Sequence, residues 1–296
     1  MCLWFLLRIS RKLSVQILRL HGVLKHGPHV VLVLQLAAQS LHQLLSVSPS
    51  AISERKVARI MGHALRGLAH AHASGWSHRD IAPGNVLILP SGDTVLSDWG
   101  QATRTASTFQ AAAAGGGTLP SQAAASDEGG ASTAAGSSSS PQRGGAVDPL
   151  GLPHDAVGTR WYKPPEVLLG APSGGSAGDV WAFGMVLAEV LRQGEPLCAG
   201  SNDIAQLGLI MRTFGKPDET QWPAVTQLPD YGKLQFNVKG GAVPLHRLLP
   251  SASAHALEAV RGCLQLTPAH RIAARTLLKL PFFAGTAHAA AGDKAV

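Results

Sequence analysis

The feature that most constrains this chain is a pair of short loops rich in acidic and turn-forming residues, separated by an apolar hairpin. The first loop is His78-Arg79-Asp80-Ile81-Ala82-Pro83-Gly84-Asn85, and the second is Ser97-Asp98-Trp99-Gly100. Between them lie two apolar runs, Val86–Leu89 and Thr94–Ser97, which are joined by the turn Pro90–Asp93. Because hairpin strands run antiparallel, both loops should lie at the same end. This would gather Asp80, Asn85 and Asp98, whose oxygen atoms suit magnesium and a phosphorylated nucleotide.

The composition is that of a globular protein, since 45% of the 296 residues are hydrophobic and 15% are charged. The formal net charge is +7, but Lys and Arg form no block and no aromatic platform accompanies them. We therefore expect a solvated surface and no nucleic-acid partner. The apolar run Met1–Leu7 is too short to cross a membrane, and positive charges follow it instead of preceding it. We therefore expect neither a secretory signal nor a membrane partner.

The three cysteines form no C-x-x-C pair, so we expect neither a zinc knuckle nor a disulfide framework. A reducing compartment, the cytoplasm or the nucleus, fits this pattern. Four histidines, which are His63, His70, His72 and His78, invite a metal interpretation. They lie on mixed helix faces and loops without a partnering carboxylate, so packing is the better interpretation.

Hydrophobic periodicity predicts a small sheet followed by several helices. Residues 17–39 carry two apolar runs separated by a turn, and the β-branched run His29–Leu34 is typical of a buried strand. Ser53 is a candidate N-cap for a helix that ends at Gly75. Asp179–Leu191 is apolar on nearly every side, which indicates a buried central helix. The other expected helices are Ser40–Leu45, Asp203–Phe214, Ala252–Leu264 and Ala273–Leu278.

Residues 106–147 differ from the rest of the chain, because Ala, Gly, Ser and Thr dominate and large apolar residues are almost absent. Such a segment cannot bury a core and is expected to be disordered. Its length is tolerable, since doubling a flexible loop costs only about 0.6 kcal/mol in closure entropy. Residues 1–16 show no clear pattern, and the Ala-rich tail 284–296 is expected to be loose.

Together with motifs further along the chain, the two loops resemble the H-R-D-x-x-x-x-N and D-F-G loops of the eukaryotic protein kinases. Pro164-Pro165-Glu166 stands where that family has A-P-E, and Asp179 and Arg271 follow in the family's order. Three segments resemble the cyclin-dependent kinases in particular, and they are Gly158–Glu166, Gly194–Asp203 and Thr213–Pro217. Arg271–Ala274 resembles the cell-cycle-related kinase branch.

The resemblance implies an α+β, protein kinase-like fold, mainly the helical large lobe with a remnant of the small lobe's antiparallel sheet. The kinase domain would cover 17–283, with a partial small lobe at 17–39 and the large lobe at 40–283. The segment 106–147 would then be an insertion in the activation segment.

The resemblance also implies ATP and Mg²⁺ as cofactors and a role for each matching residue. Asp80 would accept the hydroxyl proton of a substrate Ser or Thr. The residues that would hold magnesium are Asn85 and Asp98, and the one that would brace the catalytic loop is Thr159. The residues expected around the adenine are the gatekeeper Leu34, Gln35 and Ala37 in the hinge, and Leu87 beneath the ring.

Further implications concern the large lobe and the partners. Glu166 would pair with Arg271, and Asp179 would hold the backbone of the catalytic loop. Family membership would imply protein substrates phosphorylated on Ser or Thr, proline-directed, and a cyclin-like activating partner.

The chain departs from the family where the family positions nucleotide. No Gly-rich phosphate loop precedes Ile17, and no V-A-I-K lysine is present. The first acidic residue is Glu54, so the glutamate partner of that lysine is absent too. Ala82 replaces the catalytic-loop lysine, and losing one such donor typically costs about 10²–10³ in turnover, roughly 3–4 kcal/mol. Because phosphoryl transfer depends on positioning and electrostatics, we expect little or no activity.

Further replacements concern regulation and packing. The position of the activating threonine falls on His154, and Lys163 keeps the charge of the family's arginine without its fork. Trp99 replaces the Phe of D-F-G, and His78 is expected to pack beneath it. Three interpretations stay open: a Ser/Thr kinase, a pseudokinase scaffold that binds a partner through 200–236 or the activation segment, and an N-terminally truncated, incomplete product of an active kinase gene.

Overall fold

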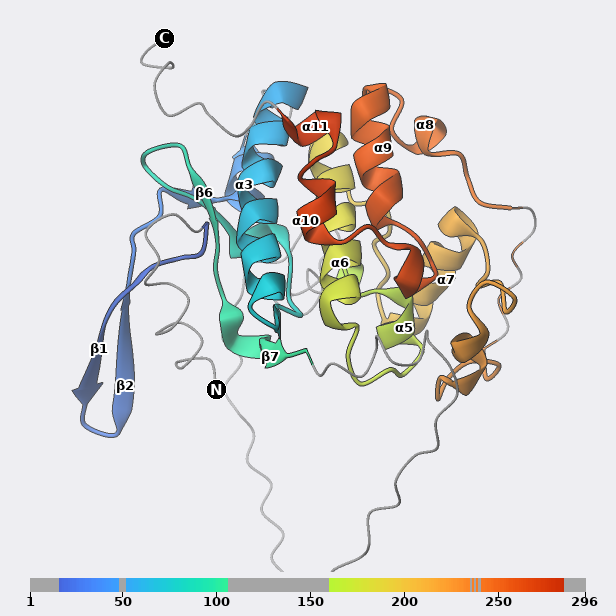
Figure 1. The fold of residues 1–296 in the computed structure, drawn as a ribbon, viewed down its shortest axis with the longest axis horizontal. Coiled ribbons are helices and arrows are strands. Elements are labelled where there is room, and N and C mark those ends of the chain that lie inside the picture. The colour runs from blue at the N-terminus through green and yellow to red at the C-terminus, as the bar shows by residue number, and fades with distance from the viewer. Residues whose placement is uncertain are drawn as a thin grey trace, which may run out of the picture. The chain divides into compact units, whose positions relative to one another are not determined.

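The computed structural model describes residues 16–47, 52–105, 160–234, 236, 238 and 241–284. Two helices, α3 (Glu54–Ala73) and α6 (Gly175–Leu191), pack against each other at its centre (Figure 1). The predicted N-cap of α3 is confirmed, because the Ser53 hydroxyl accepts the Lys56 backbone N–H at 3.3 Å. The apolar face of α3 is buried, as its spacing predicts.

Helix α6 is the buried central helix that its sequence predicts, and every residue from Gly178 to Val190 is buried. Helix α9 (Ala254–Cys263) packs on α6 so closely that a Cβ at Gly184 would lie 2.4 Å from the Cβ of Cys263. Only glycine permits this approach. The short helices α10 (Ala274–Leu277) and α11 (Pro281–Ala284) cover α3.

The other expected helices are confirmed within a few residues as α2 (Leu41–Val47) and α7 (Asp203–Phe214), besides α9 and α10. Helix α11 was not expected, although proline suits the first turn of a helix. Two further short helices are α5 (Pro165–Leu168) and α8 (Leu245–Leu248). Short 3₁₀ helices occur at Pro83–Asn85, Trp99–Gln101, Pro223–Gln227 and Pro268–His270. In the described part of the chain, no helix is both long and apolar enough to span a membrane.

The hairpin between the two acidic loops forms as predicted. Strand β5 (Val86–Ile88) pairs antiparallel with β6 (Thr94–Leu96), and β3 (Gln39–Ser40) pairs with the other edge of β5. A second small sheet joins β4 (Trp76–Ser77) to β7 (Thr103–Arg104). The first acidic loop therefore leaves β4 and enters β5, which ties both of its ends to sheets.

A third sheet consists of β1 (Leu20–His26) and β2 (His29–Leu34), joined by a turn at Gly27-Pro28. The expectation that His29–Leu34 is a buried strand is wrong, since every residue of β2 is exposed. A β-branched run predicts a strand, but burial requires covering layers. Among the described residues, β1 is the only strand that pairs with β2.

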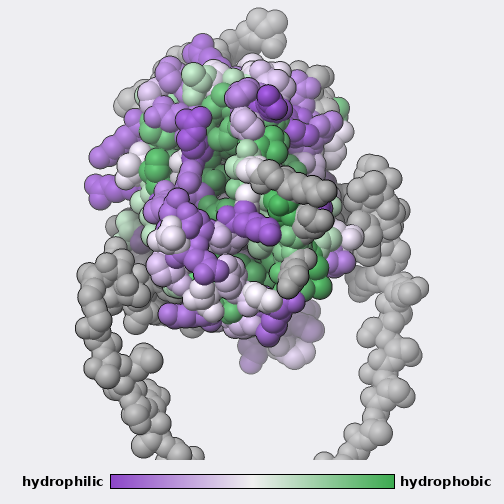
Figure 2. Space-filling model, turned by 90° about the vertical axis from the view of Figure 1, so that its right-hand side faces the viewer, coloured by the Kyte–Doolittle hydropathy of each residue, from purple (hydrophilic) through white to green (hydrophobic). Residues whose placement is uncertain are grey.

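Because side chains alternate along a strand, both faces of this hairpin present apolar groups. Val30 is 63% exposed on one face and Val31 is 41% exposed on the other. Apolar groups also reach the surface elsewhere. On the side of α7 and α8, hydrophilic residues surround apolar ones (Figure 2), and Ile204 of α7 is 56% exposed.

The expected unpatterned start, the disordered insertion 106–147 and most of the loose tail lie outside the described residues.

Replacing Val30 and Val31 together by Thr should reduce binding of the dye ANS, because each change removes apolar surface from one exposed face. The free energy of unfolding should change by less than about 1 kcal/mol, as at other surface positions. The matched control is Val86→Thr, which buries a hydroxyl at a fully buried strand position and should cost about 1–3 kcal/mol. Urea unfolding and ANS titration measure both effects. Unchanged ANS binding would show that the hairpin is covered in solution.

Candidate functional site

The backbone of the first acidic loop is held by Asp179 of α6, as the sequence predicts. The Asp179 carboxylate accepts the backbone N–H groups of His78 and Arg79, each at 2.7 Å, and lies 2.8 Å from Nε2 of His72. Asp179 is only 2% exposed, so these charge-assisted bonds form away from water. They hold Arg79 at φ +71°, a left-handed conformation that L-residues other than Asn and Asp rarely adopt.

His78 joins the first acidic loop to the second. Its ring is fully buried, and its centroid lies 4.3 Å from that of Trp99, which confirms the predicted packing. Its Nδ1 accepts the backbone N–H of Asp80 at 3.2 Å, so the neutral ring donates from Nε2 to the Ser97 carbonyl at 2.9 Å. Burial lowers the pKa of His78, which keeps the ring neutral.

Asp80 and Asn85 are brought together by this loop. The Asn85 side-chain amide donates to the Asp80 carbonyl at 2.8 Å and to Asp80 Oδ2 at 3.2 Å. The other carboxylate oxygen, Oδ1, is buried and has no hydrogen-bond partner among the described residues. A buried acceptor without a donor costs about 1–3 kcal/mol, and more when it is charged. The methyl group of Ala82 cannot supply a donor to this oxygen.

Asp98 lies next to this pair, because Ser97 donates from both its backbone N–H and its hydroxyl to the Asn85 carbonyl, at 2.9 and 3.1 Å. Asp98 is exposed and adopts φ +53°, and its Oδ1 accepts the backbone N–H of Gly100 at 3.2 Å. A Cβ at Gly100 would lie 2.9 Å from that oxygen, so a larger residue there would require the Asp98 side chain to shift.

The oxygen donors of Asn85 and Asp98 fit a magnesium ion. Among the described residues, the hydrogen bonds of the Asn85 amide group to Asp80 are both donated by Nδ2. Its amide oxygen would ligate a cation, and Asp98 would add a carboxylate. Hard oxygen ligands supplied by one or two side chains, completed by water and phosphate, are what magnesium prefers in proteins. Within the described ranges, no group of three or more His, Cys, Asp or Glu side chains is placed to hold a metal ion. The expectation that the four histidines have no partnering carboxylate is wrong for His72, which contacts Asp179.

Residues expected around the adenine fall into two groups. Leu87 and Ala37 pack on a small apolar cluster of Leu18, Leu89 and Val95, so an apolar surface lies beside the acidic loops. Leu34, at the end of β2, is 41% exposed, and the backbone N–H of Gln35 donates to the Arg19 carbonyl at 2.9 Å. Their roles toward a nucleotide stay predictions. Thr159 and His154 lie outside the described residues.

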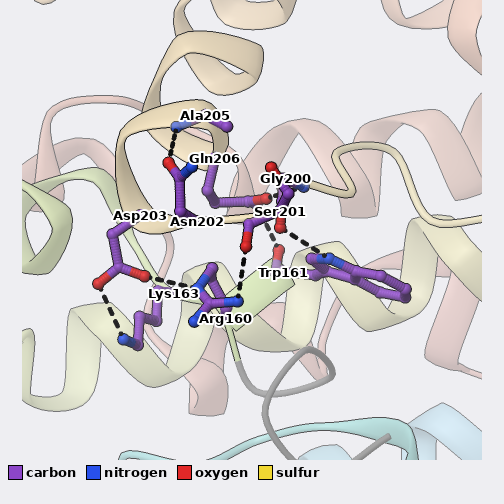
Figure 3. Close-up of polar contacts among 9 residues, drawn as sticks. All are labelled: Arg160, Trp161, Lys163, Gly200, Ser201, Asn202, Asp203, Ala205 and Gln206. Atoms are coloured by element: carbon purple, nitrogen blue, oxygen red, sulfur yellow. Dashed lines mark hydrogen bonds and ion pairs between the residues drawn. The ribbon is translucent and has the colours of Figure 1, made fainter. Parts of the chain in front are cut away.

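A cavity of about 340 Å³ opens beside Asp80. Its other walls include Lys163, Pro164 and the glycine loop Gly174–Gly175. Next to it, Asp203 at the start of α7 accepts from Arg160 Nε at 2.7 Å and from Lys163 Nζ at 3.2 Å (Figure 3). Such exposed ion pairs contribute only about 0.2–1 kcal/mol each. The sequence pattern did not indicate this arrangement.

Backbone contacts fix the segment that carries these two cations. Gln206 donates to the Trp161 carbonyl at 2.9 Å and accepts the Gly200 backbone N–H at 2.7 Å (Figure 3). The indole N–H of Trp161 donates to the Gly200 carbonyl at 3.3 Å. Segment 160–163 is therefore fastened to the loop that precedes α7.

The pair Glu166–Arg271 is confirmed. Two guanidinium nitrogens of Arg271 donate to the two carboxylate oxygens of Glu166, each at 2.7 Å, and both side chains are buried. The guanidinium also lies 5.1 Å over the ring of Trp181. This bidentate geometry fastens α5 to the loop that precedes α10.

A second buried polar pair was missed. Tyr162 donates its hydroxyl to Glu189 Oε2 at 2.7 Å, and burial raises the pKa of Glu189 to about 7. Burial is also the main cause that raises the pKa of Tyr162. The available signal was a lone glutamate inside the uniformly apolar helix α6, because a buried carboxyl needs a donor.

Comparisons with known proteins support the family resemblance of the sequence. A family model described as the protein kinase domain matches residues 6–119 and 130–283. Cyclin-dependent kinase 20 of Mus musculus is 31% identical over 270 residues, which cover 91% of this chain and 66% of that protein. The same-named protein of Danio rerio is 30% identical, covering 90% of this chain and 65% of that protein. Cyclin-dependent kinase D-1 of Oryza sativa subsp. japonica is 34% identical, covering 74% and 41%.

The chain therefore spans at most 66% of the length of these relatives.

Replacing Arg271 by Met should destabilise the protein by about 3–5 kcal/mol, because the Glu166 carboxylate would stay buried without its partner. Urea unfolding measures the change. The control is Lys233→Met, which breaks the exposed pair with Asp230 and should cost less than about 1 kcal/mol. Similar losses for the two variants would contradict a special role for the buried pair.

The stability of the protein should fall as the pH rises through 7, because the folded-state pKa of Glu189 lies above its ordinary value of 4.5. Folding favours the protonated form, so this contribution is complete below about pH 4.5 and is lost as Glu189 ionises near pH 7. Glu189→Gln should remove up to roughly 3 kcal/mol of this pH dependence.

The matched control for that variant is Glu219→Gln, which alters an exposed pair with Tyr231 of the same 2.7 Å length. Urea unfolding of the wild type and both variants at pH 5 and pH 8 separates the effects. Equal pH profiles for wild type and Glu189→Gln would exclude Glu189 as the source.

Proposed function

The chain belongs to the protein kinase family, and within it to the cyclin-dependent kinases, and we propose that it transfers the γ-phosphoryl group of ATP to Ser or Thr of protein substrates. The observation that supports this most is the geometry of Asp80. Its loop is held by a buried carboxylate, its Oδ2 is bound by Asn85, and its buried Oδ1 has no partner among the described residues. The residue itself lines a cavity.

In the proposed reaction, Asp80 orients the acceptor hydroxyl and takes its proton. The acceptor oxygen forms a bond to the γ-phosphorus, and the bond from that phosphorus to the oxygen shared with ADP breaks. The electron pair of the broken bond leaves with ADP. Asn85 and Asp98 would hold magnesium, which when bound neutralises charge on the phosphates. Leu87 and Ala37 would lie against the adenine.

Proline-directed substrates, a cyclin-like activating partner and a place in the cytoplasm or nucleus are part of the same proposal. The substrates and the partner are supported by the cyclin-dependent kinase resemblance of segments such as Gly194–Asp203 and by the names of the relatives, and the compartment only by the absence of a C-x-x-C pair among the three cysteines. Ala82 limits the expected rate, because the donor that would face the developing charge is missing, which corresponds to about 10²–10³ in turnover.

A pseudokinase scaffold is the second candidate, and two observations favour it. The hairpin β1–β2 and Ile204 expose apolar side chains of the kind that partner proteins cover. The catalytic loop also keeps its structure without the lysine that catalysis would need. If the chain is a pseudokinase, the same loop would take part in binding a partner or a nucleotide and not in catalysis.

Asp80→Asn should reduce phosphorylation of a Ser- or Thr-containing peptide by at least about 10² in kcat, since it removes the proton acceptor. The stabilisation by magnesium and ATP, measured as a rise in Tm, should persist, because Asn85, Asp98 and Leu87 are unchanged. The matched control is Asp93→Asn, the same change in the exposed turn between β5 and β6, which should keep full activity.

Two results would contradict the proposal. Wild-type protein that neither gains Tm with magnesium and ATP nor turns over would favour the scaffold. Turnover that survives Asp80→Asn would show that another group, or a contaminating kinase, carries the reaction.

A further inference from the structure

One oxygen of the carboxylate at the centre of the site has no hydrogen-bond donor in the part of the chain that the structure describes. Asp80 Oδ1 is buried without a partner among the described residues, while Asn85 occupies Oδ2. Position 82, where the resemblance places a lysine, carries only the methyl group of Ala82. An unpaired, buried and charged acceptor is unfavourable, so a nearby cation with freedom to move would be drawn to it.

Lys163 is such a cation. It lines the same cavity as Asp80, on the wall formed by the segment before α5. Its ammonium now donates to Asp203 Oδ2 at 3.2 Å, in a pair whose side chains are 36% and 51% exposed. Figure 3 shows that this contact points away from the backbone of its own segment toward the start of α7. An exposed pair of this kind is weak and is easily exchanged for another.

Asp203 does not depend on Lys163. Arg160 donates to the other carboxylate oxygen at the shorter distance of 2.7 Å and also binds the Ser201 carbonyl (Figure 3). Asp203 would therefore stay neutralised if Lys163 turned away. Lysine suits this movement better than arginine, because it carries three donors on a flexible four-carbon stem instead of a planar fork.

We propose that Lys163 exchanges between Asp203 and Asp80, and that its ammonium donates to Asp80 Oδ1 in place of the missing lysine at position 82. Lys163 is then a positioning residue, because it acts by orienting the Asp80 carboxylate and by placing a positive charge beside the transferring group. This role rests on the proposed kinase function. The neutral Thr159 cannot supply this charge.

Kinetics test the role of Lys163 in the reaction. Lys163→Ala should lower kcat at least tenfold and change the peptide KM less than twofold, because the loss concerns the reacting groups. Adding Ala82→Lys to that variant should restore kcat to within about threefold of the wild type, since it returns an ammonium group at the position where the family has its lysine. Lys216→Ala, at an exposed position before the loop that precedes Trp222, should leave kcat unchanged.

Amine labelling tests the contact without any turnover. Acetylation by N-hydroxysuccinimidyl acetate, followed by peptide mass spectrometry, gives the reaction rate of Lys163 relative to Lys216. Asp80→Asn should speed labelling of Lys163 at least twofold and leave Lys216 unchanged, and Asp203→Asn should do the same. Thermal unfolding verifies that each variant is folded. An unchanged rate in Asp80→Asn would overturn the proposal.

A failure of the proposed kinase function can be distinguished from a failure of the proposed role of Lys163. A wild type without turnover, but with labelling of Lys163 that responds to Asp80→Asn, would refute the kinase function and keep the contact. An active wild type whose kcat is insensitive to Lys163→Ala would refute the role of Lys163 alone. A loss of kcat in Arg79→Ala, without one in Lys163→Ala, would assign the role to the other cation that lines the cavity.

Discussion

The site depends on one buried carboxylate, that of Asp179. It accepts two backbone N–H groups from the first acidic loop and contacts His72, and these bonds hold Arg79 in a left-handed conformation. Because Asp179 belongs to α6, which packs between α3 and α9, the loop takes its rigidity from the core of the large lobe. Strain of this kind persists only where the surroundings hold it, and here they include the buried side chains of Asp179 and His78.

The structure separates two requirements of phosphoryl transfer, which are positioning and the stabilisation of charge. The two loops are joined to each other, since His78 and Ser97 connect the segments that carry Asp80, Asn85 and Asp98. The Gly-rich loop and the V-A-I-K lysine that position nucleotide in the family do not occur in the sequence. Charge stabilisation is weakened, since Ala82 offers no donor and Asp80 Oδ1 has no described partner. A chain of this kind can be a slow enzyme or a rigid binding module. Which of the two it is depends on whether another cation reaches the Asp80 carboxylate. Lys163 is the cation that we propose.

Most elements of the large lobe could be predicted from local patterns. The Ser53 cap, the apolar face of α3 and the all-apolar α6 follow from propensity and spacing, which act within a few residues. Contacts over long separations, such as Glu166 with Arg271, were predicted only through the family resemblance. The pair of Tyr162 with Glu189 and the shared position of Asp203 between two cations were missed. Single charged residues in a sequence do not reveal which partner the fold supplies.

The amino-acid sequence alone determined the family, most of the longer helices of the large lobe and the three oxygen-bearing residues of the two loops, because these depend on residue order and local spacing. Tertiary structure decided the burial and the hydrogen-bond partners of those residues. Hydrogen bonds to the buried Asp179 of α6 hold the loop, and Asp80 Oδ1 has no partner among the described residues. Burial within α6 raised the pKa of Glu189. It also decided that the β-branched strand β2 is exposed, because burial depends on which layers cover a strand and not on the strand's own residues.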